Sequence, residues 1–397
     1  MKGKALVISV GTGTRQDAQE SLAHGICCSI KGNNPDHTVF VVTKESRDKT
    51  LPLIKNNLGA SLKSCEEHQL SDADNVSTIY KEMAALLKGL KKEYNELAVD
   101  FTSGTKAMSG GLTIAACLLE VDALCYITGE RQNGIVAKGT EELKYVSPLA
   151  VASDRRLAEA VLLFNRHQYD GVTAIVNELE KTTSSDAILS KFNDLKTAAL
   201  AYSYWDKFNH NEARGHLRNV KNEIFNENKR FFAELDKGND KEPYYVADLI
   251  NNAKRRADEG KYDDAVARLY RTTELLSQYS LKEHDYPSTE NVEVDKLPSE
   301  IIDKYQLKKG SKCNIALDMG WNILAVKGDR VAQQYIKDNA IKDALNKRNK
   351  SILAHGLEPL KKDDFDRLLN RVLNYARLKI PRLDDYLRWS AFCEWPL

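Results

Sequence analysis

The sequence predicts an α/β unit followed by an all-α region, and three observations support this. Over residues 1–150, short β-branched runs alternate with segments whose apolar residues recur every three or four positions. Such alternation is typical of a parallel sheet covered by helices on both faces. After Pro148 the strand pattern stops and charged amphipathic helices take its place. The chain has 397 residues, which is enough for two or three domains.

The first region is expected to contain five parallel strands joined by crossover helices. A terminal hairpin is also expected, because Gly139 and Thr140 lie between two short β-branched runs. The predicted strands are 5–10, 38–43, 61–65, 97–102 and 123–128, the predicted helices are 16–31, 47–57, 75–92 and 106–119, and the hairpin strands are 135–138 and 143–146.

The second region is expected to be helical throughout, with a long internal loop after residue 284. A loop-like break at 237–240 suggests a boundary, so the predicted domains are 1–150, a helical connector at 151–240, and 241–397. The predicted helices are 155–166, 187–208, 211–235, 244–259, 262–282, 315–326, 331–345 and 365–380.

Composition excludes several classes of protein. The chain carries 58 Lys+Arg and 57 Asp+Glu, so its net charge gives no global argument for binding nucleic acid or a membrane. Its seven cysteines form no C-x-x-C pair, which favours a reducing cytoplasm over a disulfide framework or a zinc ribbon. The apolar run at 5–10 is too short for a signal peptide, and no run approaches the length of a bilayer span. We therefore expect a soluble cytoplasmic protein that needs no metal or cofactor.

The first candidate site is the loop Gly11-Thr12-Gly13-Thr14, which follows the first predicted strand. Glycines at such a turn let the backbone approach a phosphate, and the next helix offers free N–H groups. The loop departs from the G-x-G-x-x-G fingerprint, because Gln16 stands at the third glycine position. A tight turn that binds no ligand is the alternative.

A second loop, Thr102-Ser103-Gly104-Thr105-Lys106, follows the fourth predicted strand and opens a helix. The carboxyl ends of parallel strands meet at one edge of a sheet, so both loops are expected to face one ligand. Lys106 supplies a positive charge, the hydroxyls supply hydrogen-bond donors, and the helix dipole adds a partial positive charge. The sequence therefore predicts an anion site without metal or hydride chemistry.

Together the two loops resemble the CARF domain, the CRISPR-associated Rossmann-like sensor of cyclic oligoadenylates. The motif Asp100-x-Thr102-x-Gly104-Thr105-Lys106 carries most of this resemblance, which covers residues 1 to about 150. It implies a homodimer in which the hydroxyls and lysines of both protomers surround a ring of AMP units. Cyclic oligoadenylate is then the expected activator.

The helical region contains a third candidate site, Arg348-Asn349 followed by His355. The seven-residue spacing equals about two helical turns, so Arg348 and His355 are predicted to lie on nearly the same helix face. Such a spacing also arises by chance in a chain with this many arginines and histidines. The alternative is that His355 caps a helix end before Gly356.

These residues resemble the R-N-x(n)-H signature of HEPN ribonucleases, and CARF followed by HEPN is the layout of type III CRISPR accessory ribonucleases of the Csm/Csx kind. Residues 250–282 further resemble one CARF–HEPN subfamily. The resemblance implies two copies of the site meeting in a cleft at the dimer interface, where single-stranded RNA is cleaved.

Metal-independent cleavage by the RNA's own 2′-hydroxyl is the chemistry that these residues suit. Histidine exchanges protons near neutral pH, so His355 is the expected acid and base. Arg348 is expected to hold the scissile phosphate, and Asn349 to orient His355 or a phosphate oxygen. The expected products are a 2′,3′-cyclic phosphate and a 5′-hydroxyl.

Two other functions stay open at this stage. The first is a non-enzymatic, cyclic-nucleotide-binding regulator whose helical half binds a protein or nucleic acid. The second, compatible with the main interpretation, is slow cleavage of the cyclic ligand by the sensor domain through Thr12, Thr14 and Lys106. The remaining histidines show no metal-ligand spacing and are interpreted as ordinary surface or helix residues.

Overall fold

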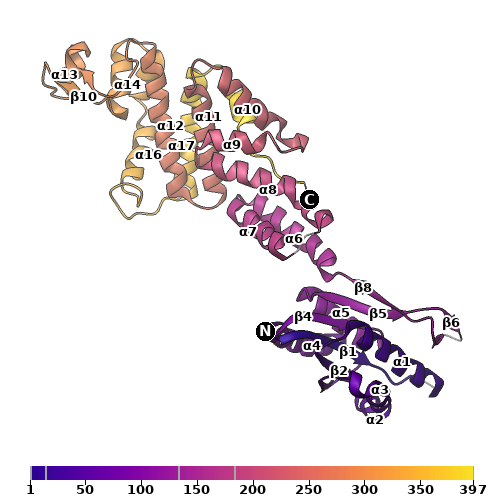
Figure 1. Ribbon diagram of the computed structural model, residues 1–397. Helices are drawn as coiled ribbons and strands as arrows, with labels where there is room; N and C mark the ends of the chain where they lie inside the picture. Colours follow the sequence, from indigo (N-terminus) through magenta and orange to yellow (C-terminus); the bar gives the residue numbers. More distant parts are fainter. Residues whose placement is uncertain (1, 14–15, 133–134, 183–184, 397) are drawn as a thin grey trace. The chain divides into compact units, whose positions relative to one another are not determined.

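The chain forms two compact units, Met1–Ala158 and Glu159–Leu397. The computed structural model describes residues 2–13, 16–132, 135–182 and 185–396 (Figure 1). The first unit is a mixed sheet with helices and the second is helical, so the predicted fold class is confirmed. None of the described helices has the length and apolar character needed to cross a membrane.

The main sheet has the order β3-β2-β1-β4-β5-β8 in the part of the chain that is described. Its first five strands are parallel, and β8 is antiparallel to β5 at the edge. The strands are β1 (Lys2–Val10), β2 (His37–Val42), β3 (Cys65–Gln69), β4 (Tyr94–Asp100), β5 (Ala123–Thr128) and β8 (Glu142–Val146).

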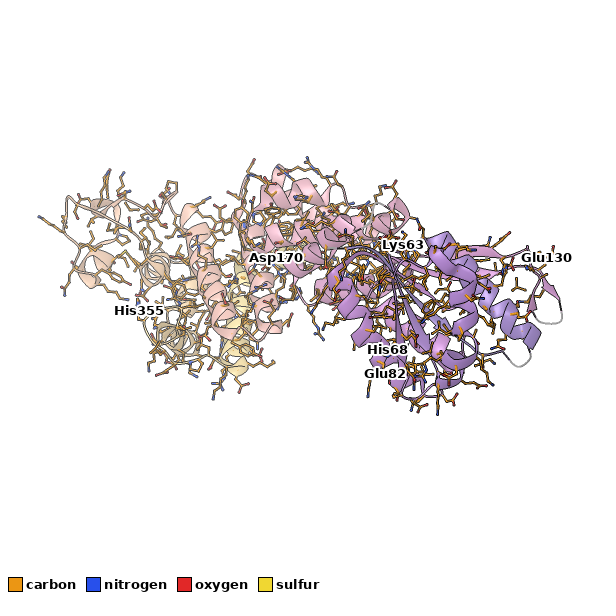
Figure 2. The ribbon with its side chains drawn as sticks, turned by 60° about the horizontal axis from the view of Figure 1, so that its bottom comes forward. Lys63, His68, Glu82, Glu130, Asp170 and His355 are labelled. Atoms are coloured by element: carbon orange, nitrogen blue, oxygen red, sulfur yellow. The ribbon has the colours of Figure 1, made fainter. Side chains whose placement is uncertain are left out.

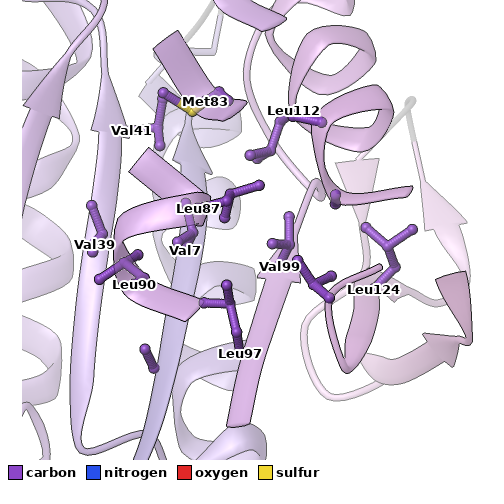
Figure 3. Packing of buried hydrophobic residues seen from close by; sticks show 14 of the residues in the cluster. Val7, Val39, Val41, Met83, Leu87, Leu90, Leu97, Val99, Leu112 and Leu124 are labelled. Atoms are coloured by element: carbon purple, nitrogen blue, oxygen red, sulfur yellow. The ribbon is translucent and has the colours of Figure 1, made fainter. Parts of the chain in front are cut away.

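Each face of the sheet buries its own hydrophobic core, because alternate side chains of a strand point in opposite directions. Val7 of β1 packs in the core beneath α4 (Val76–Glu93) and α5 (Lys106–Leu118), as Figure 3 shows. Leu6 and Ile8 pack in the opposite core, which also contains residues of α1 (Gln16–Asn33) and α3 (Leu51–Leu58). The expectation of helices on both faces is therefore confirmed.

Three local predictions in this unit are wrong. The strand predicted at 61–65 lies instead at Cys65–Gln69, on the sheet edge, where exposed polar residues leave no apolar alternation to detect. The helix predicted at 47–57 is two helices, α2 (Lys44–Lys49) and α3, because Pro52 at the start of α3 cannot donate a helical hydrogen bond. The predicted hairpin does not form.

The segments of that hairpin pair with other strands. β7 (Ile135–Val136) pairs with β6 (Arg131–Gln132), while β8 completes the main sheet beside β5. Long-range pairing with an existing sheet therefore overrides the local turn signal at Gly139 and Thr140.

The second unit is built from helices, with one small β9–β10 ribbon among its described residues. Two predicted helices, 211–235 and 331–345, are each interrupted, the second because Asp338 caps a new helix start. The helices are α6 (Pro148–Asn165), α7 (Tyr169–Thr182), α8 (Asp186–Asp206), α9 (His210–Leu217), α10 (Asn226–Lys237), α11 (Glu242–Asp258), α12 (Tyr262–Lys282), α13 (Ser299–Lys304), α14 (Leu317–Val326), α15 (Arg330–Tyr335), α16 (Asn339–Asn349), α17 (Lys362–Lys379) and α18 (Leu383–Trp389). The ribbon strands are β9 (Val292–Glu293) and β10 (Lys312–Cys313).

An ion-pair network at the end of α8 joins that helix to α11. The carboxylate of Asp206 accepts hydrogen bonds from Arg255 Nε at 2.9 Å and from Arg256 Nη2 at 2.7 Å. Both arginine side chains are largely buried, with 5% and 13% of their surface exposed. A role in packing therefore accounts for this basic pair without an RNA contact.

Candidate functional site

The two predicted ligand loops come together at the carboxyl ends of neighbouring strands. β1 and β4 are paired in parallel, and the loops that follow them are hydrogen-bonded to each other. The Ser103 hydroxyl accepts the Gly11 N–H at 2.8 Å and donates to the Ser9 carbonyl at 3.1 Å, while the Ser9 hydroxyl donates to the Ser103 carbonyl. Ser103 is buried and its hydroxyl is used in these bonds, so it holds the two loops together.

Glycine is required at three places in these loops. A Cβ atom on Gly11 would lie 2.7 Å from the Gly104 backbone nitrogen, so the close approach of the two loops excludes a side chain there. Gly13 and Gly104 have φ angles of +68° and +108°, in the left-handed region that other residues rarely adopt. Thr12 is partly exposed beside them, and Thr14 lies outside the described residues.

The second loop ends in a capped helix start whose outer groups face solvent. Thr105 is the N-cap of α5, where its hydroxyl accepts the Met108 N–H at 3.1 Å and donates to the Ala73 carbonyl at 2.9 Å. Gly104, Thr105 and Lys106 are exposed. An exposed lysine at a helix N-terminus, beside free backbone N–H groups, is a favourable environment for a phosphate.

Behind these exposed groups lies a buried polar cluster that shapes the loop. The Asp100 carboxyl accepts the Thr102 N–H at 2.7 Å and the Ser29 hydroxyl, and the Thr102 hydroxyl accepts the Ile127 N–H at 2.8 Å. Burial raises the pKa of Asp100, and its hydrogen bonds oppose that shift. Asp100 and Thr102 therefore act as positioning groups for the loop that carries Lys106.

Replacing Gly11 with alanine is expected to destabilise the first unit by about 1–3 kcal/mol, because the new methyl group must push two backbone segments apart. Urea unfolding of the full chain followed by circular dichroism measures this change. Gly89→Ala is the matched control, since nothing lies within 4 Å of a Cβ there, and alanine in a helix should stabilise by about 0.5–1 kcal/mol. Equal stability of the two variants would contradict the close approach of the loops.

The second candidate site lies at the end of α16. Arg348 and Asn349 are the last two residues of this helix, and His355 belongs to the turn that follows. The prediction that Arg348 and His355 share a helix face is therefore wrong. The helix ends because the chain folds back: the N–H of Ser351 donates to the Arg348 carbonyl and that of Glu358 to the Lys350 carbonyl, both at 3.0 Å.

The turn nevertheless brings His355 back to the helix end. Its backbone N–H donates to the Asn349 carbonyl at 3.1 Å, while its imidazole is exposed (Figure 2). Thus the backbone of His355, and not its ring, caps the helix. Gly356 permits this fold, because a Cβ there would lie 2.7 Å from Lys350 Cα and still closer to its carbonyl group.

The guanidinium of Arg348 packs over an aromatic ring. Its guanidinium carbon lies 4.5 Å from the centre of the Tyr270 ring on α12, a cation–π contact. Its Nη1 donates to the Asn349 side-chain oxygen at 3.4 Å, and its buried Nε has no hydrogen-bond partner among the described residues. These contacts therefore fix the orientation of the guanidinium, and some of its N–H groups remain available to bind an anion.

Exposed apolar side chains surround His355. Ile352, Leu353 and Leu357 are 66%, 45% and 87% exposed. Three large apolar side chains of one short segment therefore face solvent.

A pocket of about 520 Å³ lies between α16 and α17, and its lining includes Lys347, which precedes Arg348 in the sequence. Sequence reasoning assigned no role to its residues, although arginines and asparagines four residues apart on α17 are a signal that helical spacing can reveal. The lining comprises Ala340, Asp343, Ala344, Lys347, Asp364, Arg367, Asn370, Arg371 and Asn374.

Two family models match the helical part of the chain. Residues 153–242 match the family model described as the Csm6 6H domain, and residues 234–379 match the one described as the Csm6 HEPN domain. The latter range contains Arg348, Asn349 and His355. A search of curated proteins returned no match.

Among solved structures, the chain is similar to Enterococcus italicus Csm6 bound to cyclic hexa-2′-fluoro-hexa-dAMP. The TM-score is 0.64 and the identity is 12%, over 98% of both chains. Can2 from Sulfobacillus thermosulfidooxidans in complex with cyclic tetra-adenylate also matches, with 11% identity over 52% of this chain and 67% of the other. Its TM-score of 0.25 is too low to indicate a shared fold.

The order of elements agrees with these matches. A six-stranded sheet with helices precedes a helical region, the fold is shared with a Csm6 over nearly its whole length, and two Csm6 domain models together cover residues 153–379. The chain belongs to the CRISPR-associated CARF–HEPN proteins.

Proposed function

We propose that this protein is a cytoplasmic ribonuclease that cleaves single-stranded RNA in type III CRISPR antiviral defence once it binds a cyclic oligoadenylate. The observation that carries the proposal is the turn at 348–355, which presents an oriented arginine and an exposed histidine within the segment that matches the Csm6 HEPN model. The sensor loops support the same interpretation, because they present Thr105 and Lys106 at a helix N-terminus.

The proposed chemistry requires three events at one phosphate. The 2′-hydroxyl loses a proton and attacks phosphorus, charge builds up on the phosphorane oxygens, and the leaving 5′-oxygen gains a proton. His355 serves as the acid and base, Arg348 holds the charge, and Asn349 positions His355 or a phosphate oxygen. The products are a 2′,3′-cyclic phosphate and a 5′-hydroxyl, formed without a metal ion.

A homodimer completes this site in the proposal. A single arginine, asparagine and histidine make a sparse site, and apolar Ile352, Leu353 and Leu357 stand exposed around them. A second copy of the chain would cover these apolar side chains and supply a second Arg348–His355 pair. Ligand binding at the sensor loops would change how the two pairs meet, which is an allosteric coupling.

The test is a fluorophore–quencher RNA incubated with the purified full-length protein and cyclic tri-, tetra- or hexa-adenylate. Cleavage with one ring and none without it is the expected result. Binding of a ring without cleavage by any of them would contradict the ribonuclease and favour a regulator whose helical half binds another partner. Chromatography of the cyclic oligoadenylate during the incubation shows whether the ring is consumed. This tests whether Thr12, Thr14 and Lys106 also support slow ligand cleavage.

Cleavage is expected to persist at an undiminished rate in excess EDTA, because the proposed acid, base and charge stabiliser are all side chains. The measurement is the initial rate at saturating activator, with and without the chelator. A rate that falls to background in EDTA and returns when Mg²⁺ is added would instead indicate a metal-dependent nuclease.

A further inference from the structure

A cluster of three different metal-ligating side chains lies in the first unit. Among the described residues, His24, Cys28 and Glu141 are the only group of three or more His, Cys, Asp or Glu whose ligand atoms gather closely, all within 4.8 Å of one another. His24 and Cys28 lie one turn apart on α1 and therefore share a face. Glu141 comes from the loop before β8, so only the tertiary structure brings it to them.

The separations of His24 from its two partners suit a tetrahedral zinc ion. His24 Nε2 lies 3.7 Å from Cys28 Sγ and 3.3 Å from Glu141 Oε1. Ordinary zinc–nitrogen, zinc–sulfur and zinc–oxygen bond lengths at tetrahedral angles place nitrogen about 3.6 Å from sulfur and about 3.4 Å from oxygen. Both separations thus fit a shared ion with shifts of a few tenths of an ångström.

The carboxylate is already oriented toward this position. Only 9% of the Glu141 side chain is exposed, and its Oε2 accepts the Gly139 N–H at 2.7 Å, which leaves Oε1 directed at His24. Carboxylates that bind a metal through one oxygen usually accept a hydrogen bond at the other oxygen. The His24 side chain is 38% exposed, so an ion can reach the cluster from solvent.

The donor types of the cluster also suit a divalent cation. Imidazole, thiolate and carboxylate are together the donor set that zinc takes.

We propose that His24, Cys28 and Glu141 bind one zinc ion, with water in the fourth position, and that this ion fastens α1 to the loop before β8. The inference is independent of the proposed ribonuclease activity. A simple histidine–glutamate contact is the alternative, and the chain contains a matched example of it. His68 Nε2 lies 3.3 Å from Glu82 Oε2, the same separation, and these two residues belong to no such ligand group (Figure 2).

The first experiment titrates Zn²⁺ into full-length protein that carries no affinity tag and has been dialysed against a chelator. Calorimetry is expected to show one ion per chain. His24→Ala, Cys28→Ser and Glu141→Gln should each weaken binding at least tenfold, while His68→Ala should leave it unchanged. Glu141→Gln keeps an oxygen for the Gly139 N–H, so it tests coordination without disturbing the loop. Absence of zinc binding by the unsubstituted protein, or binding that none of the three substitutions weakens, would overturn the proposal.

A second experiment identifies the thiol directly. Alkylation of individual cysteines, followed by mass spectrometry, should show that Zn²⁺ slows the reaction of Cys28 at least tenfold and leaves the exposed Cys65 unaffected. Co²⁺ in place of Zn²⁺ should produce a thiolate-to-metal charge-transfer band that is absent in Cys28→Ser. Equal alkylation of Cys28 with and without zinc would contradict coordination by its sulfur.

Discussion

Replacing His355 with alanine is expected to reduce activated RNA cleavage by about 10²- to 10⁴-fold, because the substitution removes the proposed general acid and base. The side chain is exposed on a turn that its backbone N–H maintains, so the fold should be preserved. The measurement is the single-turnover rate at saturating activator and enzyme. The affinity for the cyclic oligoadenylate, measured by calorimetry, should not change.

His216→Ala is the control for this prediction. His216 lies on α9 in the same unit, where its ring stacks on Tyr204 at 5.5 Å between centres. Its loss should leave the cleavage rate within a factor of two or so, since it removes no group from the proposed site. Cleavage that survives in His355→Ala, with the cyclic phosphate still formed, would remove His355 from the chemistry.

Replacing Lys106 with alanine is expected to raise the activator concentration needed for half-maximal cleavage by about tenfold or more. A charged hydrogen bond to a phosphate contributes about 1.5–3 kcal/mol, and about 1.4 kcal/mol corresponds to a factor of ten. Lys106 is exposed at the first position of α5, so the substitution should leave folding intact. The maximal rate at saturating activator should be retained.

Lys88→Ala provides the matched control, because it removes an exposed lysine from α4 of the same unit. If long-range charge alone attracts the activator, both variants will shift by similar amounts, and the shift will vanish at high salt. An unchanged half-maximal concentration in Lys106→Ala would exclude this lysine from the ligand site. That result would leave the prediction for His355 untouched, since the two predictions test different units.

The α/β unit and the helical region were predictable from local sequence because both depend on short-range patterns. Buried central strands such as β1 are nearly continuous apolar runs, and amphipathic helices repeat every three or four residues. The meeting of the two candidate ligand loops was predictable for a related reason, since parallel pairing of β1 and β4 places both carboxyl ends at one edge. The edge strand β3 was placed wrongly because its exposed residues carry no apolar signal.

The detailed geometry of the helical site was not predictable from spacing. A seven-residue interval is compatible with a continuous helix, yet α16 ends at Asn349 and a turn returns His355 to that end. Tertiary contacts make the difference: Tyr270, far away in the sequence, holds the guanidinium of Arg348. Likewise, the pocket between α16 and α17 exists only because two helices pack side by side.

The sequence alone determined the class of each unit, the positions of the loops that carry hydroxyls and Lys106, and the presence of Arg348, Asn349 and His355. Those features follow from short-range periodicity and from residue chemistry, which a linear chain displays directly. Tertiary structure decided which groups meet: Ser103 with Gly11, Arg348 with Tyr270, and Glu141 with His24. Such contacts join residues roughly 80 to 120 positions apart, and only the packing of helices and strands brings side chains so distant in sequence within a few ångströms of each other.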